Sequence, residues 1–150
     1  MNLKNIDVLT IFDECVRIHL IMSTKRKISD KDWDILKKKM AASEYRADVD
    51  FAEDEFAYIE SRGMDMLVRH ARDFVERRLG PAKPRNEGKQ TPLKGHPIFL
   101  AQHATGTNSR SALAEFHGIP EGEKLTDDQV AFVTDVILRW VNERIVTHKA

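Results

Sequence analysis

Residues 96 to 117 hold most of the side chains in this sequence that could bind a polar ligand or move a proton. They combine imidazoles, short hydroxyls, one carboxamide and one guanidinium: His96, Gln102, His103, Thr105, Thr107, Arg110 and His117. Imidazole can exchange a proton near neutral pH, and guanidinium binds phosphate and carboxylate groups. The residue types and their closeness along the chain indicate a pocket for an anion or another polar ligand.

Arg110 is the residue we expect to hold the anion. It stands just inside the predicted start of a helix, where unpaired backbone N–H groups and the helix dipole favour negative charge. Thr105 and Thr107 would add hydroxyl donors, and Gly106 would let the backbone approach a ligand closely. A bound phosphate is therefore the expected ligand chemistry.

An ordinary capped turn is the competing interpretation of the same residues. The side chains from Thr105 to Ser109 could satisfy the unpaired donors at the helix start, and His103 or His117 could be hydrogen-bonded within a core. The segment carries more donors than capping requires, which favours a binding site.

A basic, turn-rich loop precedes this segment. Four of the five prolines lie between Pro81 and Pro97, whereas residues 1–62 contain neither Gly nor Pro. Long loops without regular structure are usually functional or disordered. One acid, Glu87, faces six bases in residues 77–96: Arg77, Arg78, Lys83, Arg85, Lys89 and Lys94. We expect Arg78, Arg85, Lys89, Gln90 and Lys94 to join the site; a solvated basic face is the alternative.

The sequence offers one candidate catalytic residue. His103 could act as a general base, while Gln102 and Arg110 orient the substrate and stabilise charge. The sequence has no nucleophile elbow, no carboxylate pair with divided roles, and no phosphate-loop or dinucleotide fingerprint. We therefore expect a non-catalytic protein that binds a nucleic acid or nucleotide. An enzyme acting on a nucleotide or nucleobase is the alternative.

Cysteine and histidine spacing does not indicate a metal or a cofactor. His103 and His117 are too far apart for a local ligand pair, and no Cys, Asp or Glu stands at finger-like spacing near them. Cys15 is the one cysteine, which fits a reducing compartment. No apolar run approaches the ~18 residues of a membrane span. We expect a cytoplasmic protein with no metal, no cofactor and no membrane contact.

Length and apolar spacing predict an all-α fold. The 150 residues are 41% hydrophobic and 32% charged with zero formal net charge, which suits one globular domain without a global attraction to nucleic acid. Apolar residues recur at helical spacing, and Ser29 with Asp32 and Thr126 with Gln129 form capping pairs. They predict a bundle of about five to six helices. We expect helices that start at Ser29 and at Pro97, and helices over 52–62, over 64–79, from Asn108 or Ser109 to 117, and over 126–146. The helix over 126–146 should be the central one.

Residues 4–22 carry two apolar rows on one predicted helix. The first row is Ile6, Leu9, Phe12, Val16 and Leu20, and the second is Ile11, Cys15, Ile18 and Met22. A helix that is apolar on two sides is buried or paired with another chain. We expect residues 1–30 to be an extension of a helical domain over 31–150 that contains the polar loop 80–110. A protein partner, or a homodimer formed through this helix, would follow.

A family resemblance covers much of the chain. Residues 88–117 resemble the hallmark of an uncharacterised family of small bacterial and phage proteins, known as a domain of unknown function. The specific part of this segment is the string GHPIFLAQHATGT at residues 95–107. Further similar segments extend the resemblance over about residues 36–141: 43–46, 58–63, 70–71, 78–84, 118–120 and the helix around Trp140. A third interpretation is a protein-interaction module, such as a phage-encoded inhibitor, in which the two-sided N-terminal helix pairs with another chain and the polar turn is structural.

The chain departs from the family pattern at its cysteines. That pattern has cysteines after the second threonine and three residues further on, where this chain has Asn108, Ser109 and Ala112. His103, Arg110 and His117 remain in step with it. The resemblance implies that a function of those three residues could survive here, whereas a thiol-bound metal could not.

Overall fold

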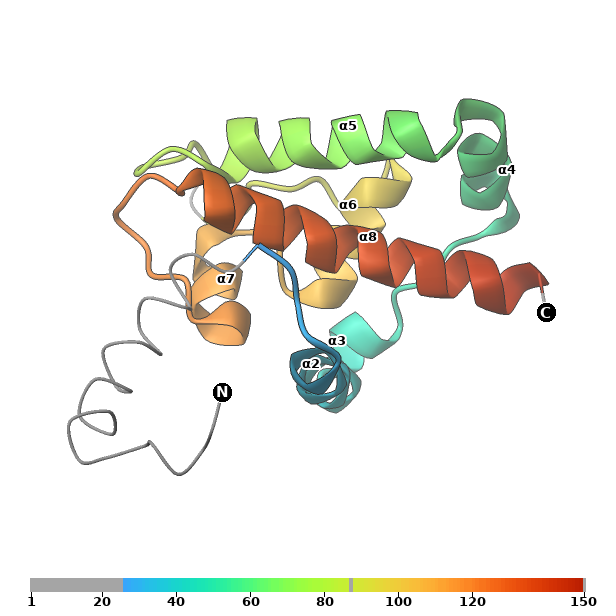
Figure 1. The fold of residues 1–150 in the computed structure, drawn as a ribbon, viewed down its shortest axis with the longest axis horizontal. Helices are drawn as coiled ribbons and strands as arrows, with labels where there is room; N and C mark the ends of the chain where they lie inside the picture. Colours follow the sequence, from blue (N-terminus) through green and yellow to red (C-terminus); the bar gives the residue numbers. More distant parts are fainter. Residues whose placement is uncertain (1–25, 87, 150) are drawn as a thin grey trace, which may run out of the picture.

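Seven α-helices and one π-helical segment make up the part of the chain that the computed structural model describes, residues 26–86 and 88–149 (Figure 1). In chain order they are α2 Asp30–Ala42, α3 Glu44–Ala47, α4 Glu53–Arg62, α5 Met64–Phe74, the π-helical segment Val75–Leu79, α6 Pro97–Thr105, α7 Arg110–His117 and α8 Asp127–Lys149. No strand occurs among these residues, which confirms the all-α prediction. The short helix α3 was not predicted, and the expected helix over 4–22 lies outside the described residues.

Capping side chains set the helix starts where the sequence predicted them. The Ser29 hydroxyl accepts a hydrogen bond from the Asp32 N–H at 3.1 Å. At the start of α8, Thr126 and Gln129 bond each other's backbone N–H groups at 2.9 and 3.0 Å. Each cap satisfies donors that a helix start leaves unpaired.

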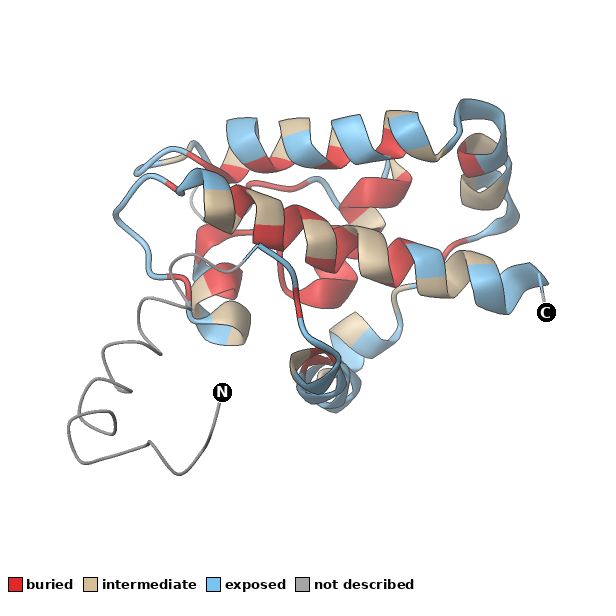
Figure 2. Ribbon diagram, viewed as in Figure 1, coloured by how far each residue is buried: buried red, intermediate tan, exposed pale blue. Residues whose placement is uncertain are grey.

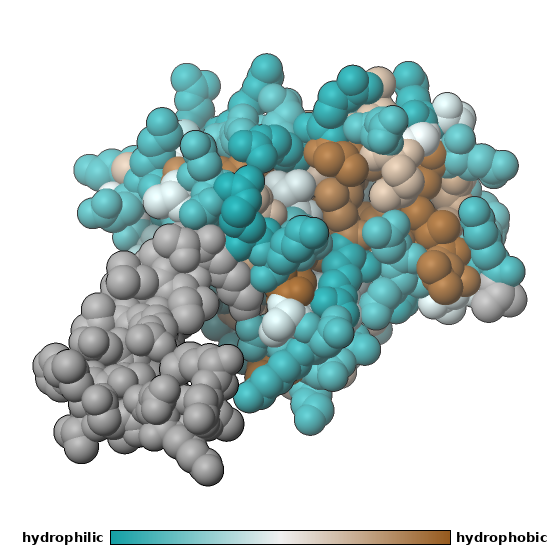
Figure 3. All heavy atoms as spheres, viewed as in Figure 1, coloured by the Kyte–Doolittle hydropathy of each residue, from teal (hydrophilic) through white to brown (hydrophobic). Residues whose placement is uncertain are grey.

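Helix α8 is central, as predicted. Val133, Val136, Ile137 and Val141 on it are fully buried. It packs against α5 and α6, and Figure 2 shows buried positions on the face that α5 turns toward α8. Figure 3 shows that hydrophilic side chains cover most of one face of the molecule, with apolar patches along the α5–α8 seam and over the C-terminal half of α8. No described helix is long and apolar enough to cross a membrane.

Helix α6 lies inside the bundle and carries the polar residues Gln102, His103 and Thr105 with it. It contacts α2, α3, α4, α5 and α8. Eight of its nine residues are buried, including Gln102, His103 and Thr105. The polar residues at 102–105 are therefore core residues, and each of them needs a partner inside the protein.

The predicted helix over 64–79 ends in the π-helical segment, where Gly80 N–H bonds the Val75 carbonyl at 2.9 Å. A Cβ at Gly80 would collide with the carbonyl oxygen of Glu76, so glycine is required there. The described residues that follow, 81–86 and 88–96, have no regular structure, as expected. Their described backbone forms one internal hydrogen bond, from Lys89 N–H to Asn86 O at 2.6 Å. The loop must therefore be positioned by side chains from elsewhere.

The turn between α6 and α7 generates a prediction about stability. Gly106 has φ +68°, and a Cβ there would lie 2.5 Å from Cγ of Phe116. We expect Gly106→Ala to lower the free energy of unfolding by more than about 1 kcal/mol, because both the backbone and the contact resist it. Urea denaturation measures this change.

A double-mutant cycle with Phe116→Ala separates the two causes. If the contact matters, Gly106→Ala costs less in the Phe116→Ala background than in the native chain. Equal costs in both backgrounds would show that Phe116 plays no part.

Candidate ligand-binding site

Arg110 joins three segments of backbone. It is 3% exposed. Its Nη1 donates to the carbonyls of Leu79 at 3.0 Å and Pro81 at 2.9 Å, and its Nη2 donates to those of Pro120 at 2.8 Å and Glu123 at 2.7 Å. These bonds tie the end of the π-helical segment, the start of the loop and the turn after α7 to one side chain.

The two terminal nitrogens of the Arg110 guanidinium are therefore occupied in this structure, whereas its buried Nε–H has no protein partner. Its two terminal nitrogens carry four N–H groups, and four carbonyls take them. Burial lowers the pKa of Arg110, and the Glu121 carboxylate acts in the opposite direction. The phosphate contact expected of Arg110 stays a prediction: Nε–H has no partner to give up, whereas a contact from either terminal nitrogen would require one of these carbonyl bonds to break.

His103 holds the second half of the loop. It is 5% exposed, and its Nε2 lies 3.0 Å from the Pro92 carbonyl and 3.2 Å from that of Thr91. Two carbonyl acceptors require a proton on Nε2, so Nδ1 accepts from the Tyr45 hydroxyl at 2.7 Å. Burial lowers the pKa of His103, which keeps the imidazole neutral. A general-base role stays a prediction; the proton within reach of Nδ1 is the phenolic proton of Tyr45.

Helix α3 supplies a further side chain that holds this region by hydrogen bonds, which we call a clamp, as we do Arg110 and His103. The sequence did not predict it. Arg46 Nη1 donates to the carbonyl of His103 at 2.5 Å and to Oδ1 of Asn108 at 2.9 Å, and its guanidinium lies 4.5 Å from the ring centroid of Phe116. Tyr45 and Arg46 belong to the segment 43–46 of the family resemblance, which was the one signal that could have identified them.

Gln102, Thr105 and Thr107 close the turn around Gly106 from within. Gln102 Nε2 donates to the Thr107 carbonyl at 3.1 Å, and the Thr107 N–H donates to the Gln102 carbonyl at 2.9 Å. The Thr105 hydroxyl donates to the Ala101 carbonyl at 2.7 Å and lies 2.9 Å from that of Thr107. His117 Nε2 lies 2.8 Å from the Thr105 carbonyl. These contacts are those of a structural turn, and ligand roles for the four residues remain predictions.

His96 lies away from this turn, in an aromatic cluster. Its Nδ1 accepts from the Ile98 N–H at 3.0 Å as the cap of α6, so Nε2 carries the proton and faces Nδ1 of His70 at 2.9 Å. The Tyr58 hydroxyl lies 3.4 Å from the same Nε2. Burial, helped by His70, lowers the pKa of His96 to about 4. The sequence analysis did not assign His70 or Tyr58 to a site, although both lie in segments of the family resemblance, 70–71 and 58–63.

Among the described residues, no group of three or more His, Cys, Asp or Glu side chains is placed to bind a metal ion.

The cations of the loop remain on its outer side. Lys83, Arg85, Lys89 and Lys94 are exposed, and Arg78 is half-buried with its guanidinium 4.9 Å from the Phe99 ring centroid. None of these five forms an ion pair with another described residue, whereas Arg77 pairs with Asp73 at 2.9 Å. They could therefore meet an anionic partner.

Loop and turn pack together, but they do not form the single hollow that the sequence suggested. Gln90 and Thr91 point inward and are 6% and 5% exposed. Gln90 lines a hollow of about 370 Å³ that Lys83, Arg110 and Glu121 also line. Four buried polar atoms in this region have no protein partner: Gln90 Oε1, Thr91 Oγ1, Gln102 Oε1 and Arg110 Nε. Polar groups of the turn lie inside the protein, and cations of the loop lie outside it.

Arg110→Lys tests the clamp. Lysine keeps the charge but cannot reach four carbonyls, so we expect the free energy of unfolding to fall by at least about 2 kcal/mol. We also expect faster tryptic cleavage of the folded protein after Lys89 and Lys94. Denaturation curves and timed proteolysis measure the two effects.

The matched control is Arg77→Lys, whose side chain is 78% exposed. It should change stability by less than about 0.5 kcal/mol. If Arg110→Lys is equally mild, the four carbonyl bonds do not hold the loop.

The lowered pKa of His96 predicts a pH effect. Because the unfolded chain takes up a proton at a higher pH than the folded chain, the stability that neutral His96 contributes is full above pH 6.5 and is lost as the pH falls toward about 4. We expect a loss on the order of 1–3 kcal/mol across this window, after allowance for partial exposure.

His96→Asn is the comparison, because asparagine can still cap α6 but does not titrate. Urea midpoints at several pH values should fall less steeply with acid for the variant. Parallel curves would exclude His96 as the source.

Comparison with known proteins identifies the family of this chain. No solved structure matches it. The family model described as a domain of unknown function, DUF4186, matches residues 26–142, which span α2 to most of α8 and include every side chain of the candidate site. The chain belongs to the DUF4186 family.

Proposed function

We propose that this protein binds an anionic, phosphate-bearing partner through the cations of the 80–96 loop and Arg78, with nucleic acid as the leading candidate and a nucleotide as the next. One observation carries the proposal: Arg78, Lys83, Arg85, Lys89 and Lys94 have no ion pair with another described residue, on a loop held by buried side chains. Cations that are not paired within the protein can neutralise phosphates.

The buried clamps support the proposal by reducing the cost of binding. A flexible loop loses conformational entropy when a partner orders it, whereas a loop already fixed by Arg110 and His103 loses less. In this proposal those two residues position the loop, and the exposed cations make the contacts. Attraction to phosphate then depends on salt, because binding releases condensed counterions.

Exposed residues between the cations could add contacts that are not electrostatic. Leu93 is 69% exposed and precedes Lys94 directly. Phe99, in contrast, is buried beneath Arg78, so it cannot stack on a base. The proposal therefore favours recognition of a phosphate backbone over recognition of base sequence.

The origin of the protein and its location in the cell are also part of this proposal. Kinship with bacterial and phage proteins rests on the hallmark string at 95–107, and a cytoplasmic location rests on the lone Cys15. An enzyme using His103 as a base remains the alternative. The close Tyr45 hydroxyl is the observation that favours it.

Removing three loop cations tests the proposal. We expect the triple variant Arg85→Ala, Lys89→Ala, Lys94→Ala to bind labelled double-stranded DNA more weakly than the native protein at low salt. We also expect the slope of log K against log[salt] to flatten by about 1–3, since each lost phosphate contact removes about 0.9. Fluorescence anisotropy across a salt series measures both quantities.

The charge-matched control replaces three exposed lysines of α2, Lys31, Lys38 and Lys39, with alanine. It should keep the native slope. Binding lost equally in both variants, or native binding that does not change with salt, would refute recognition through this loop.

A further inference from the structure

Four half-buried rings meet where α4, α5 and the start of α6 come together. They are Tyr58, His70, Phe74 and His96, which we call the aromatic stripe. The ring centroid of His96 lies 5.2 Å from that of Tyr58 and 5.0 Å from those of His70 and Phe74. Sequence alone did not show this cluster, because Tyr58 and His96 stand 38 residues apart.

Two arginines lie against rings of the aromatic stripe. The guanidinium of Arg62 lies 5.4 Å from the ring centroid of Tyr58, and that of Arg78 lies 5.4 Å from the ring centroid of Phe74. Neither arginine forms an ion pair with another described residue. The exposed Lys94 precedes His96 by two residues, so the cationic loop leads directly into the stripe.

The tautomer of His70 leaves an N–H group for a ligand. His96 Nδ1 accepts from the Ile98 N–H, so the Nε2–H of His96 donates to Nδ1 of His70 at 2.9 Å. A neutral His70 therefore carries its own proton on Nε2. No other described residue bonds this nitrogen, and His70 is half-buried, which leaves part of it accessible to solvent. Its Nε2–H can donate to a phosphate or to the edge of a base.

Acidic side chains of α4 line a different surface. Glu53 and Glu60 line a hollow of about 510 Å³ against the end of α8, together with Ile145 and His148. They are not among the contacts of the aromatic stripe. A polyanion on the stripe would therefore meet guanidinium groups rather than these carboxylates.

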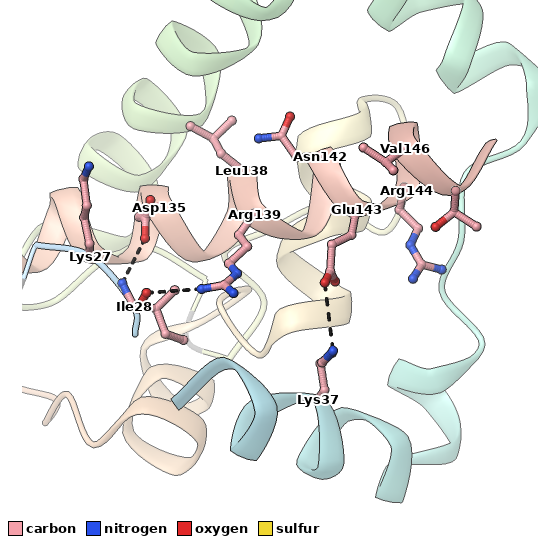
Figure 4. Close-up of a pocket in the computed structure, with 11 residues that line it drawn as sticks. Lys27, Ile28, Lys37, Asp135, Leu138, Arg139, Asn142, Glu143, Arg144 and Val146 are labelled. Atoms are coloured by element: carbon pink, nitrogen blue, oxygen red, sulfur yellow. Dashed lines mark hydrogen bonds and ion pairs between the residues drawn. The ribbon is translucent and has the colours of Figure 1, made fainter. Parts of the chain in front are cut away.

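The hollow of about 820 Å³ between α2 and α8 does not offer such a surface. Figure 4 shows that its charged side chains bond one another or the backbone. Lys37 lies 4.0 Å from Glu143. Arg139 donates to the Ile28 carbonyl at 3.3 Å, and Asp135 accepts from the Ile28 N–H at 2.9 Å. Carboxylates in this lining would repel a polyanion, and its cations already have partners.

Single-stranded nucleic acid can use both features of the aromatic stripe. Proteins that bind single strands combine cations along the backbone with aromatic rings or guanidinium planes that stack on bases. A duplex keeps its base faces stacked inside, so it can use the cations but not the rings. The stripe would therefore add binding energy for a single strand that a duplex does not receive.

We infer that the aromatic stripe, with Arg62 and Arg78, binds the bases of a single-stranded nucleic acid whose phosphates lie on the cationic loop. The four rings in contact, the two unpaired guanidinium groups and the free N–H of His70 carry this inference. It rests on the proposed function and narrows the partner to a single strand. Little sequence preference follows, since every base has a face that can stack.

Two labelled DNA ligands test the inference: a mixed-sequence single strand of about 20 nucleotides, long enough for one binding site, and the duplex of the same sequence. We expect the native protein to bind the single strand at least about fivefold more tightly at equal salt. His70→Gln keeps an N–H donor but removes a ring. It should weaken single-strand binding by about fivefold or more and duplex binding by less than about twofold. Fluorescence anisotropy measures each affinity.

Arg62→Lys is the second variant, at an exposed position where the fold tolerates the change. Lysine keeps the charge but has no planar group to stack on a base, so single-strand binding should weaken while duplex binding stays the same. The matched control is Arg77→Lys, at an arginine that pairs with Asp73 and contacts no ring of the stripe. It should leave both affinities unchanged.

Two results would overturn the inference and leave the proposed function standing. One is a native protein that binds the single strand no more tightly than the duplex. The other is a preference for the single strand that neither His70→Gln nor Arg62→Lys reduces. Binding of both ligands that does not change with salt would refute the proposed function instead, and the inference would fall with it.

Discussion

Buried donors that satisfy the backbone carbonyls of an irregular loop are the constraint on which this structure depends. The described loop residues, 81–86 and 88–96, form neither helix nor strand, so most of their carbonyls lack the partners that regular structure supplies. Arg110 takes the carbonyls of Leu79 and Pro81, and His103 takes those of Thr91 and Pro92. Leaving such groups unpaired in the interior would cost about 1–3 kcal/mol each, so the loop and these two side chains need one another.

The same constraint explains why a polar segment lies inside the bundle. Helix α6 can be buried on nearly all sides because its polar side chains find partners on α3, in the loop and in the turn around Gly106. Asn108, Ser109 and Ala112, the positions discussed under the family resemblance, are part of this arrangement. Asn108 accepts from Arg46, Ser109 caps α7 by accepting from Ala112 N–H at 3.0 Å, and Ala112 is buried. In this chain these positions support the fold without sulfur.

Much of the fold could be predicted from sequence because its signals are local. The capping pairs at Ser29 and Thr126, the proline at the start of α6 and the apolar spacing of α8 each depend on residues within one or two turns. Helix α3 has four residues, too few to show an apolar period, so it was missed. The extent of the loop was also predictable, since its prolines and glycines exclude helix and strand.

The site was less predictable because its geometry depends on contacts far apart in the chain. Donor-rich residues such as Arg110 and His103 attract a ligand if they face solvent, and they bind backbone if they face inward. Sequence alone does not tell these cases apart. His70 and Tyr58 were missed because nothing local links them to His96, which lies 26 and 38 residues away. Exposure of the loop lysines and Arg85 fits both a binding role and the alternative of a solvated basic face, since lysine and arginine are rarely buried without a partner.

The most direct test of the central claim is an NMR measurement on the Arg110 side chain in the native protein. The account predicts separate, slowly exchanging Nη–H signals, with couplings across hydrogen bonds to the carbonyl carbons of Leu79, Pro81, Pro120 and Glu123. Arg77, which is exposed, should give a single averaged and rapidly exchanging signal. An Arg110 signal as averaged as that of Arg77 would contradict the account, because the loop would then lack the clamp on which its position depends.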